Sequence, residues 1–318
     1  MMRLSLHCRN REDTLIIAYF RLNLKMWIMI TEQHKDAVYF SNLFARHYPE
    51  IYEELSDILS HHHVAHGTLM HTKDYWCRDY MPIQWGYKTY IQFRYEPDYL
   101  ADKPQYKTNI EPVLKAIERK MNITQSPLVI DGGNVVVCEV NSEEPYMKDW
   151  KPIIVMTEKV FQENSQIAWE EVIAILKENF YGAEIVFLPW DKSDVCGHTD
   201  GIIHNVGNGK VLVNLNVYPL KIAREMSRRL SKVFVVIDLK LSEYHHNSWA
   251  YINMLQTHDV IIVPGLGLPT DREALEQIKE LYPSYEDRIY QVNIASIIER
   301  WGGALNCLSW TLSEYISG

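Results

Sequence analysis

Five short polar motifs recur along the chain at similar intervals, and this recurrence constrains the fold more than any other feature of the sequence. Successive motifs are separated by 52 to 67 residues. A fixed spacing of about 20 to 50 residues marks repeat and propeller architectures, and the spacing here is slightly longer. The five motifs are Trp76-Cys77-Arg78-Asp79, Asp131-Gly132-Gly133-Asn134, Gly197-His198-Thr199-Asp200, Tyr251-Ile252-Asn253 and the segment from Gly302-Gly303 to Cys307.

Helical patterns alternate with short apolar runs between these motifs. Because equivalent strand ends of a propeller converge on one axis, polar residues far apart in the sequence would share one central pocket. The sequence therefore predicts a five-bladed α/β propeller, with the alternative that unrelated polar positions happen to be evenly spaced. The predicted helices are 112–121, 168–180, 220–233 and 271–281; the predicted strands are 128–130, 184–188, 233–237 and 288–292, with a hairpin of 202–205 and 210–214 around Gly207-Asn208-Gly209.

The chain from Met29 onward is expected to form one domain. No long Pro-, Gly- or Ser-rich linker interrupts the alternating pattern after Asp36, so residues 29–318 are interpreted as a single catalytic domain. Residues 1–28 carry scattered basic side chains, weak periodicity and no small-residue cleavage site. We interpret residues 1–28 as an N-terminal extension, either an upstream-start artefact or a loose arm, because Met29 opens a conventional start.

The charge balance argues against polyanionic partners. With 32 basic and 41 acidic residues, the net charge is −9 at pH 7, which repels nucleic acids and anionic membranes and favours cationic small molecules. The apolar stretch Thr14 to Phe20 is closed by Arg21, so no segment is long enough to span a bilayer. Five cysteines without a CxxC pair favour the reducing cytoplasm. A homo-oligomer is left open.

The first two motifs are ambiguous when each is taken alone. Trp76-x-Arg78-Asp79-x-x-Pro82 places a carboxylate in a constrained turn, but an Arg-Asp dipeptide is more often a surface ion pair. The two glycines after Asp131 allow a close approach of the backbone beside an acid. An ordinary hairpin turn would explain the second motif equally well.

The later motifs add a titratable base and a thiol. In an extended segment, residues two apart face the same side, so His198 and Asp200 are predicted to project together. Cys307 lies in what reads as an apolar strand, where a buried and inert thiol is the commoner outcome. Together the motifs supply a cysteine, a histidine and three carboxylates, the set required for nucleophilic attack on a cation. Two carboxylates match the planar guanidinium, which stays charged at physiological pH.

This constellation resembles the agmatine deiminase and bacterial-type peptidylarginine deiminase family of the guanidino-group-modifying superfamily. The resemblance covers about residues 29 to 318 and implies the pentein fold, with no metal or organic cofactor. It implies that Asp79 and Asp200 grip the guanidinium and that Cys307 attacks its central carbon. It also implies that His198 protonates the departing ammonia and then activates water, with Asp131 orienting it. The other motif residues, Trp76, Arg78 and Asn253, are expected to line the substrate site.

The sequence departs from this family at two points. Asp131 stands where agmatine deiminases usually carry a glutamate, so its reach toward His198 is a specific question for the structure. Asn306 precedes the nucleophile where the family usually has histidine, and Leu308-Ser309-Trp310 replaces Thr-Gln-Gln after it. These changes affect the expected substrate tail more than the expected reaction.

The leading functional hypothesis is hydrolysis of agmatine to N-carbamoylputrescine and ammonia through a covalent thiouronium on Cys307. The same intermediate could pass to an amine, which would make the protein an amidinotransferase. A peptidylarginine deiminase and a catalytically silent pentein that binds a cation or a protein are further alternatives.

Overall fold

Five small sheets around a common axis define the architecture. The computed structural model describes residues 30–117, 119–139 and 152–314; the extension predicted for residues 1–28 lies outside them. Within these residues, every sheet has three strands. The sheets are β15 (Ser309–Leu312), β1 (Ala37–Ser41) and β2 (Ala65–Leu69); β3 (Ile83–Gly86), β4 (Thr89–Arg94) and β5 (Asn122–Val129); β6 (Val136–Cys138), β7 (Ile153–Thr157) and β8 (Glu184–Leu188); β9 (Ile203–Gly207), β10 (Lys210–Val213) and β11 (Val235–Asp238); and β12 (Leu255–Gln256), β13 (Ile261–Gly265) and β14 (Ile289–Asn293).

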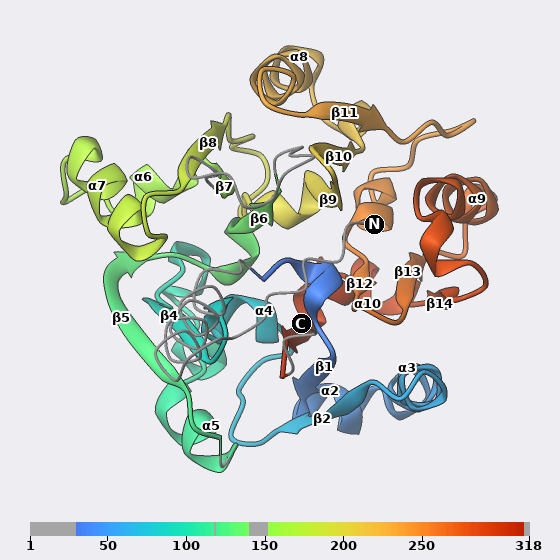
Figure 1. The fold of residues 1–318 in the computed structure, drawn as a ribbon, viewed down its shortest axis with the longest axis horizontal. Helices are drawn as coiled ribbons and strands as arrows, with labels where there is room; N and C mark the ends of the chain where they lie inside the picture. The colour runs from blue at the N-terminus through green and yellow to red at the C-terminus, as the bar shows by residue number, and fades with distance from the viewer. Residues whose placement is uncertain (1–29, 118, 140–151, 315–318) are drawn as a thin grey trace, which may run out of the picture.

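All five sheets repeat one topology. The first strand of each is antiparallel to the second, and the second is parallel to the third. A parallel pair requires a crossover, which here carries the longer helices. Figure 1 shows α3, α5, α7, α8 and α9 on the outside of the ring. The crossover elements are α2 (Asn42–His47), α3 (Pro49–His61), η2 (Asp98–Leu100), η3 (Pro104–Tyr106), α5 (Ile110–Ala116), α6 (Lys159–Glu163), α7 (Trp169–Asn179), η6 (Leu215–Val217), α8 (Leu220–Leu230), α9 (Asp271–Leu281) and η8 (Pro283–Tyr285).

The blade containing β1 closes the ring with both ends of the described chain. Strand β15 comes from the C-terminal part and pairs with β1, with Ala37 opposite Leu312 and Phe40 opposite Ser309. The 3-10 helix η1 (Glu32–His34) lies just before β1. Helix α10 (Ala295–Trp301) follows β14 and connects its sheet to the segment before β15. This pairing brings residues far apart in sequence into one sheet.

The core of each blade lies between its sheet and its outer helix. Val172 and Leu176, one turn apart on α7, pack with Ile154 and Met156 of β7, and all four are fully buried. This spacing is the amphipathic pattern from which the helix was predicted. Burial of each such side chain contributes about 1.5–3 kcal/mol. Within the described residues, no helix combines the length and the apolar character needed to cross a membrane.

The five-bladed α/β propeller predicted from the motif spacing is confirmed by these sheets. The predicted helix 271–281 has the observed bounds, and the hairpin around Asn208 is formed by β9 and β10. Three predicted elements differ from the structure by three or more residues at one end: α8 ends at Leu230 instead of Val233, α5 spans Ile110–Ala116 instead of 112–121, and β5 spans Asn122–Val129 instead of 128–130. Both helices end early because the chain must turn into the following strand.

Candidate active site

A short helical turn precedes the first strand of every sheet, and each of these turns carries one of the five motifs. The turns are α4 (Cys77–Tyr80) before β3, η4 (Gly132–Asn134) before β6, η5 (Thr199–Gly201) before β9, η7 (Ser248–Ile252) before β12 and α11 (Leu305–Leu308) before β15. Neighbouring turns contact one another near the axis, as α4 does with η4 and α11, and as η5 does with η4 and η7. The repeat therefore gathers the motif residues at one end of the propeller.

One group of side chains surrounds the thiol. Cys307 Sγ lies 3.4 Å from Asn253 Oδ1 and 3.6 Å from Asp200 Oδ2. Asn253 Oδ1 also accepts from the backbone N–H of Cys307 at 3.3 Å, and Asn253 Nδ2 donates to the Asp200 carbonyl at 3.1 Å. Asn306 Nδ2 donates to Asp200 Oδ2 at 2.7 Å. The amide of Asn253 thus links the turn of Asp200 to the turn of the cysteine.

A second group surrounds the imidazole. His198 Nε2 lies 3.1 Å from Asp131 Oδ2, and His198 Nδ1 lies 3.6 Å from Asp79 Oδ1. The hydroxyl of Tyr99 donates to the same Asp131 oxygen at 2.8 Å. Asp79 Oδ1 accepts from the backbone N–H of Gly133 at 3.0 Å. The shorter side chain of Asp131 therefore reaches His198.

Burial and mutual repulsion perturb the charged groups. The three carboxylates Asp79, Asp131 and Asp200 are at most 6% exposed. Burial, followed by the charges of Asp131 and Asp200, raises the pKa of Asp79 to about 7 against the lowering effect of His198. Burial alone would lower the pKa of His198, but Asp79 and the hydrogen bond to Asp131 raise it well above its ordinary value. The imidazole therefore favours its protonated form at neutral pH.

The thiol is uncharged in this environment. Burial raises the pKa of Cys307 well above its ordinary value, and the charges of Asp200 and Asp79 raise it further. Its side chain is 7% exposed. A cation placed between the carboxylates would act in the opposite direction, because it would favour the thiolate.

Two local predictions about these residues were wrong. His198 and Asp200 do not occupy one extended strand, because η5 is a 3-10 turn that Ile202 N–H closes on the Thr199 carbonyl at 2.9 Å. Their side chains therefore contact different partners, His198 the carboxylates of Asp79 and Asp131 and Asp200 the thiol. Cys307 lies in the helical turn α11 and not in a strand, since β15 begins only at Ser309.

Trp76 and Arg78 lie at the edge of this arrangement. A Cβ on Gly303 would approach the Trp76 ring to 2.2 Å, so the second of the paired glycines allows the indole to pack against the chain near the cysteine. The guanidinium of Arg78 donates to Asn306 Oδ1 at 2.8 Å and to Thr311 Oγ1 at 3.1 Å. These two hydrogen bonds of Arg78 are with the C-terminal segment that carries Cys307 and β15.

Sequence reasoning missed two positions. Tyr99 lies in the short 3-10 helix η2 just after Pro97, and no sequence pattern points to its contact with Asp131. Asn306 was noticed only as a departure from the family pattern, although its amide contacts Asp200 and Arg78. Among the described residues, no group of three or more His, Cys, Asp or Glu side chains is arranged to hold a metal ion.

A comparison with models of known protein families confirms the family resemblance that the motifs suggested. The model of the Porphyromonas-type peptidyl-arginine deiminase matches residues 28–312. The chain belongs to this deiminase family. Members of the Porphyromonas-type deiminase family are C–N hydrolases that act on guanidino groups. No curated protein matches the sequence of this family member.

Solved structures share the pentein fold of this deiminase. The agmatine deiminase of C. jejuni is 16% identical with a TM-score of 0.66, covering 89% of this chain and 95% of that one. The agmatine deiminase of Enterococcus faecalis is 15% identical with a TM-score of 0.62, covering 89% and 95%. An amidinotransferase of Microseira wollei from saxitoxin biosynthesis is 10% identical with a TM-score of 0.58, covering 92% and 98%. At these identities the likeness concerns the fold, which deiminases and an amidinotransferase share.

Proposed function

We propose that this protein hydrolyses the guanidino group of agmatine, giving N-carbamoylputrescine and ammonia. The proposal includes a covalent thiouronium on Cys307, protonation by His198, orientation of His198 by Asp131 and a grip on the substrate cation by Asp79 and Asp200. Trp76, Arg78 and Asn253 form the edge of the substrate site. The net charge of −9 agrees with a cationic substrate.

One observation carries the proposal. Asp200 Oδ2 lies 3.6 Å from the thiol, while Asp79 Oδ1 lies 3.6 Å from the imidazole. A guanidinium bound by both carboxylates would therefore lie between the nucleophile and the proton donor. Its planar set of N–H donors suits paired carboxylates, and such charge-assisted hydrogen bonds are roughly twice as strong as neutral ones.

The substrate itself would activate the nucleophile. The raised pKa of Cys307 keeps the thiol protonated in the resting site. A bound guanidinium offsets the carboxylate charges and lies beside the sulfur, so it lowers the thiol pKa, and the thiol proton leaves to solvent as the thiolate forms. In this mechanism the thiolate forms only when the cationic substrate is bound, and no permanent ion pair between Cys307 and His198 is needed.

The bond changes then follow in two stages. The thiolate adds to the guanidinium carbon, forming a C–S bond, and the C–N bond breaks as protonated His198 gives its proton to the departing ammonia. His198, now neutral, takes a proton from water as the water oxygen adds to the thiouronium carbon. The C–S bond breaks as the carbonyl forms, the hydroxyl proton passes to the departing sulfur and restores the thiol, and a ureido product remains. The contact with Asp131 favours the protonated imidazole needed in the first stage.

An ammonia-release screen tests this function. Agmatine, free arginine, an arginyl peptide and a methylated guanidine would be compared at one concentration, with and without an added amine. Ammonia from agmatine without an amine is the expected result. Release that requires the amine would indicate amidinotransfer, preference for the peptide would indicate a peptidylarginine deiminase, and binding without turnover would indicate a silent pentein.

A further inference from the structure

The side-chain amide of Asn306 has a fixed orientation because its two neighbours have opposite hydrogen-bonding chemistry. Arg78 can only donate, so it must face the amide oxygen, which it does at 2.8 Å. The amide nitrogen then faces Asp200 Oδ2 at 2.7 Å. Asp200 Oδ2 is also the oxygen that lies 3.6 Å from Cys307 Sγ. Arg78 therefore fixes which end of Asn306 meets the carboxylate beside the thiol.

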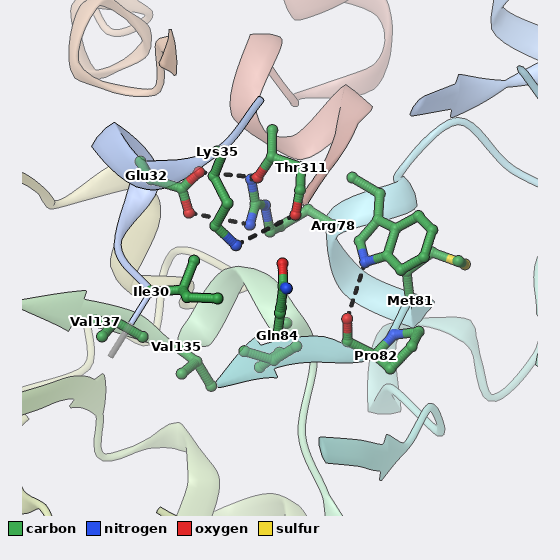
Figure 2. Close-up of a pocket in the computed structure, with 13 residues that line it drawn as sticks. Ile30, Glu32, Lys35, Arg78, Met81, Pro82, Gln84, Val135, Val137 and Thr311 are labelled. Carbon is green, nitrogen blue, oxygen red and sulfur yellow. Dashed lines mark hydrogen bonds and ion pairs between the residues drawn. The ribbon is translucent and has the colours of Figure 1, made fainter. Parts of the chain in front are cut away.

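Arg78 is held in turn by the segment before the first strand. Glu32 Oε1 lies 3.4 Å from Arg78 Nη1, and Glu32 Oε2 accepts from Thr311 Oγ1 at 2.8 Å. Figure 2 shows Glu32 and Thr311 converging on the Arg78 guanidinium. Three segments far apart in sequence thus meet at one guanidinium.

The Glu32 carboxylate also offsets the charges of two cations, Arg78 and Lys35. Among the described residues, Glu32 is the acid that forms an ion pair with Arg78. Lys35 lies beside the same pair and donates to the Thr311 carbonyl at 3.2 Å, and burial lowers the pKa of Lys35 to about 8 although Glu32 raises it. Lys35 can lose its proton in response to a change nearby, whereas Arg78 cannot. Removal of the Glu32 charge would therefore leave an uncompensated guanidinium behind the cysteine.

We propose that Glu32 is a positioning residue of the active site, acting through Arg78 and Asn306 on Asp200 and Cys307. It touches neither substrate nor thiol. Its carboxylate holds Arg78 against Asn306 and keeps the guanidinium charge of Arg78 from competing with the substrate cation for Asp200. This inference rests on the proposed function for its kinetic consequence, but the chain of contacts can be tested without any substrate.

Glu139 provides a matched control. It is partly buried like Glu32 and binds the same N-terminal segment, accepting from Thr31 Oγ1 at 3.0 Å and from Gln33 Nε2 at 3.5 Å. It has no contact with Arg78 or Asn306 among the described interactions. Glu32→Gln and Glu139→Gln therefore each remove one carboxylate from the same region, but only the first breaks the proposed chain.

The substrate-free test is alkylation of Cys307. Full-length wild type, Glu32→Gln and Glu139→Gln are treated with iodoacetamide at neutral pH, and modified cysteine peptides are quantified by mass spectrometry. An uncompensated Arg78 charge lowers the thiol pKa and a released Asn306 loosens α11, so Cys307 should react roughly threefold faster in Glu32→Gln. Cys77 and Cys138, both fully buried, report global opening in the same spectra and should not react faster.

The kinetic test uses agmatine. Glu32→Gln should raise KM about tenfold, which is the effect of weakening one hydrogen bond to a charged group. The accompanying decrease in kcat should be smaller than this increase in KM. Glu139→Gln should stay within about twofold of wild type, because the hydrogen bonds of Glu139 are with Thr31 and Gln33 and lie outside the proposed chain of contacts. Absence of ammonia release by the wild type would refute the proposed function but would leave the alkylation comparison intact.

The alkylation comparison decides the inference. Equal Cys307 rates in Glu32→Gln and Glu139→Gln would overturn it, whatever the agmatine kinetics. A parallel rise at Cys77 and Cys138 in Glu32→Gln would also overturn it, because the effect would then be general loosening of the fold. A selective rise at Cys307 in Glu32→Gln supports it.

Discussion

Asp131 Oδ2 lies 3.1 Å from His198 Nε2 and accepts a second hydrogen bond, at 2.8 Å, from the hydroxyl of Tyr99. One carboxylate oxygen of Asp131 therefore contacts both the imidazole of His198 and the hydroxyl of Tyr99. The aspartate is one methylene shorter than the glutamate usual in agmatine deiminases, yet it reaches His198 because η4 and η5 contact each other.

Tyr99→Phe should alter the pH dependence of turnover. Without the tyrosine hydroxyl, more of the Asp131 charge acts on His198, so the pKa of His198 rises and the imidazole releases its proton less readily in the second stage. We expect kcat at pH 7 to fall about threefold to tenfold and the optimum to move to higher pH. Tyr95→Phe, which removes a hydroxyl bonded to Asp74 instead, is the control. Superimposable profiles for Tyr99→Phe and wild type would contradict the role of Tyr99.

Cys307→Ser should abolish ammonia release while agmatine still binds. A serine hydroxyl is a far weaker nucleophile than a thiolate, so we expect a loss of at least about a thousandfold in kcat. Calorimetry measures the retained binding. Cys196→Ser is the control, because Cys196 is less buried than Cys307 and lies in another turn, two residues before His198. Turnover near the wild-type rate in Cys307→Ser would exclude the thiouronium mechanism.

Asp79→Asn and Asp200→Asn should weaken binding of cations selectively. Each loses a charge-assisted interaction of about 1.5–3 kcal/mol, which corresponds to roughly tenfold to a hundredfold in Kd for agmatine. The measurement is calorimetry in the Cys307→Ser background, with the uncharged urea analogue of agmatine as the matched ligand. Equal losses of affinity for the charged and the uncharged ligand would show that these carboxylates do not distinguish the two ligands by charge.

Agmatine binding should release a proton near neutral pH. Burial together with Asp131 and Asp200 raises the pKa of Asp79 to about 7, and a bound guanidinium lowers it again. Affinity should therefore increase as pH rises from about 6 to 8. The sign for folding is opposite: the folded state binds the Asp79 proton more tightly than the unfolded state, so this group makes the ligand-free protein less stable as pH rises from about 4 through 7.

Calorimetry of the Cys307→Ser protein in two buffers of different ionisation enthalpy measures this proton release. His198 faces the same carboxylates, so Asp79→Asn in that background isolates the contribution of Asp79. Its proton release at pH 7 should largely disappear. Identical proton release with and without the Asp79 carboxylate would assign the titration to another group.

Gly133→Ala should damage the site more than the fold. A Cβ at this position would lie 2.7 Å from His198 Nδ1 and 2.8 Å from Asp79 Oδ1, so the imidazole and the carboxylate must move apart. We expect kcat/KM for agmatine to fall at least about tenfold while far-ultraviolet circular dichroism stays unchanged. Gly67→Ala, whose Cβ would meet Tyr39 at an ordinary 3.5 Å, should retain activity. Full activity in Gly133→Ala would show that His198 needs no contact with Asp79.

The sequence by itself determined the repeat and its chemistry. The spacing of polar motifs predicts five blades, and helical and strand periodicity predicts elements such as α9 and β8, because these patterns depend on which side chains face a local core. The same motifs name Cys307, His198 and the three carboxylates by residue type. These inferences need only local order along the chain.

Only the tertiary structure decided how these residues meet. Local alternation placed His198 and Asp200 on one strand face and Cys307 in a strand, but all three lie in or beside short helical turns that pack against neighbouring turns around the axis. The contacts of Tyr99 with Asp131 and of Glu32 with Arg78 join segments 32 and 46 residues apart. No local pattern encodes such pairs, because closing the ring of blades sets their distances.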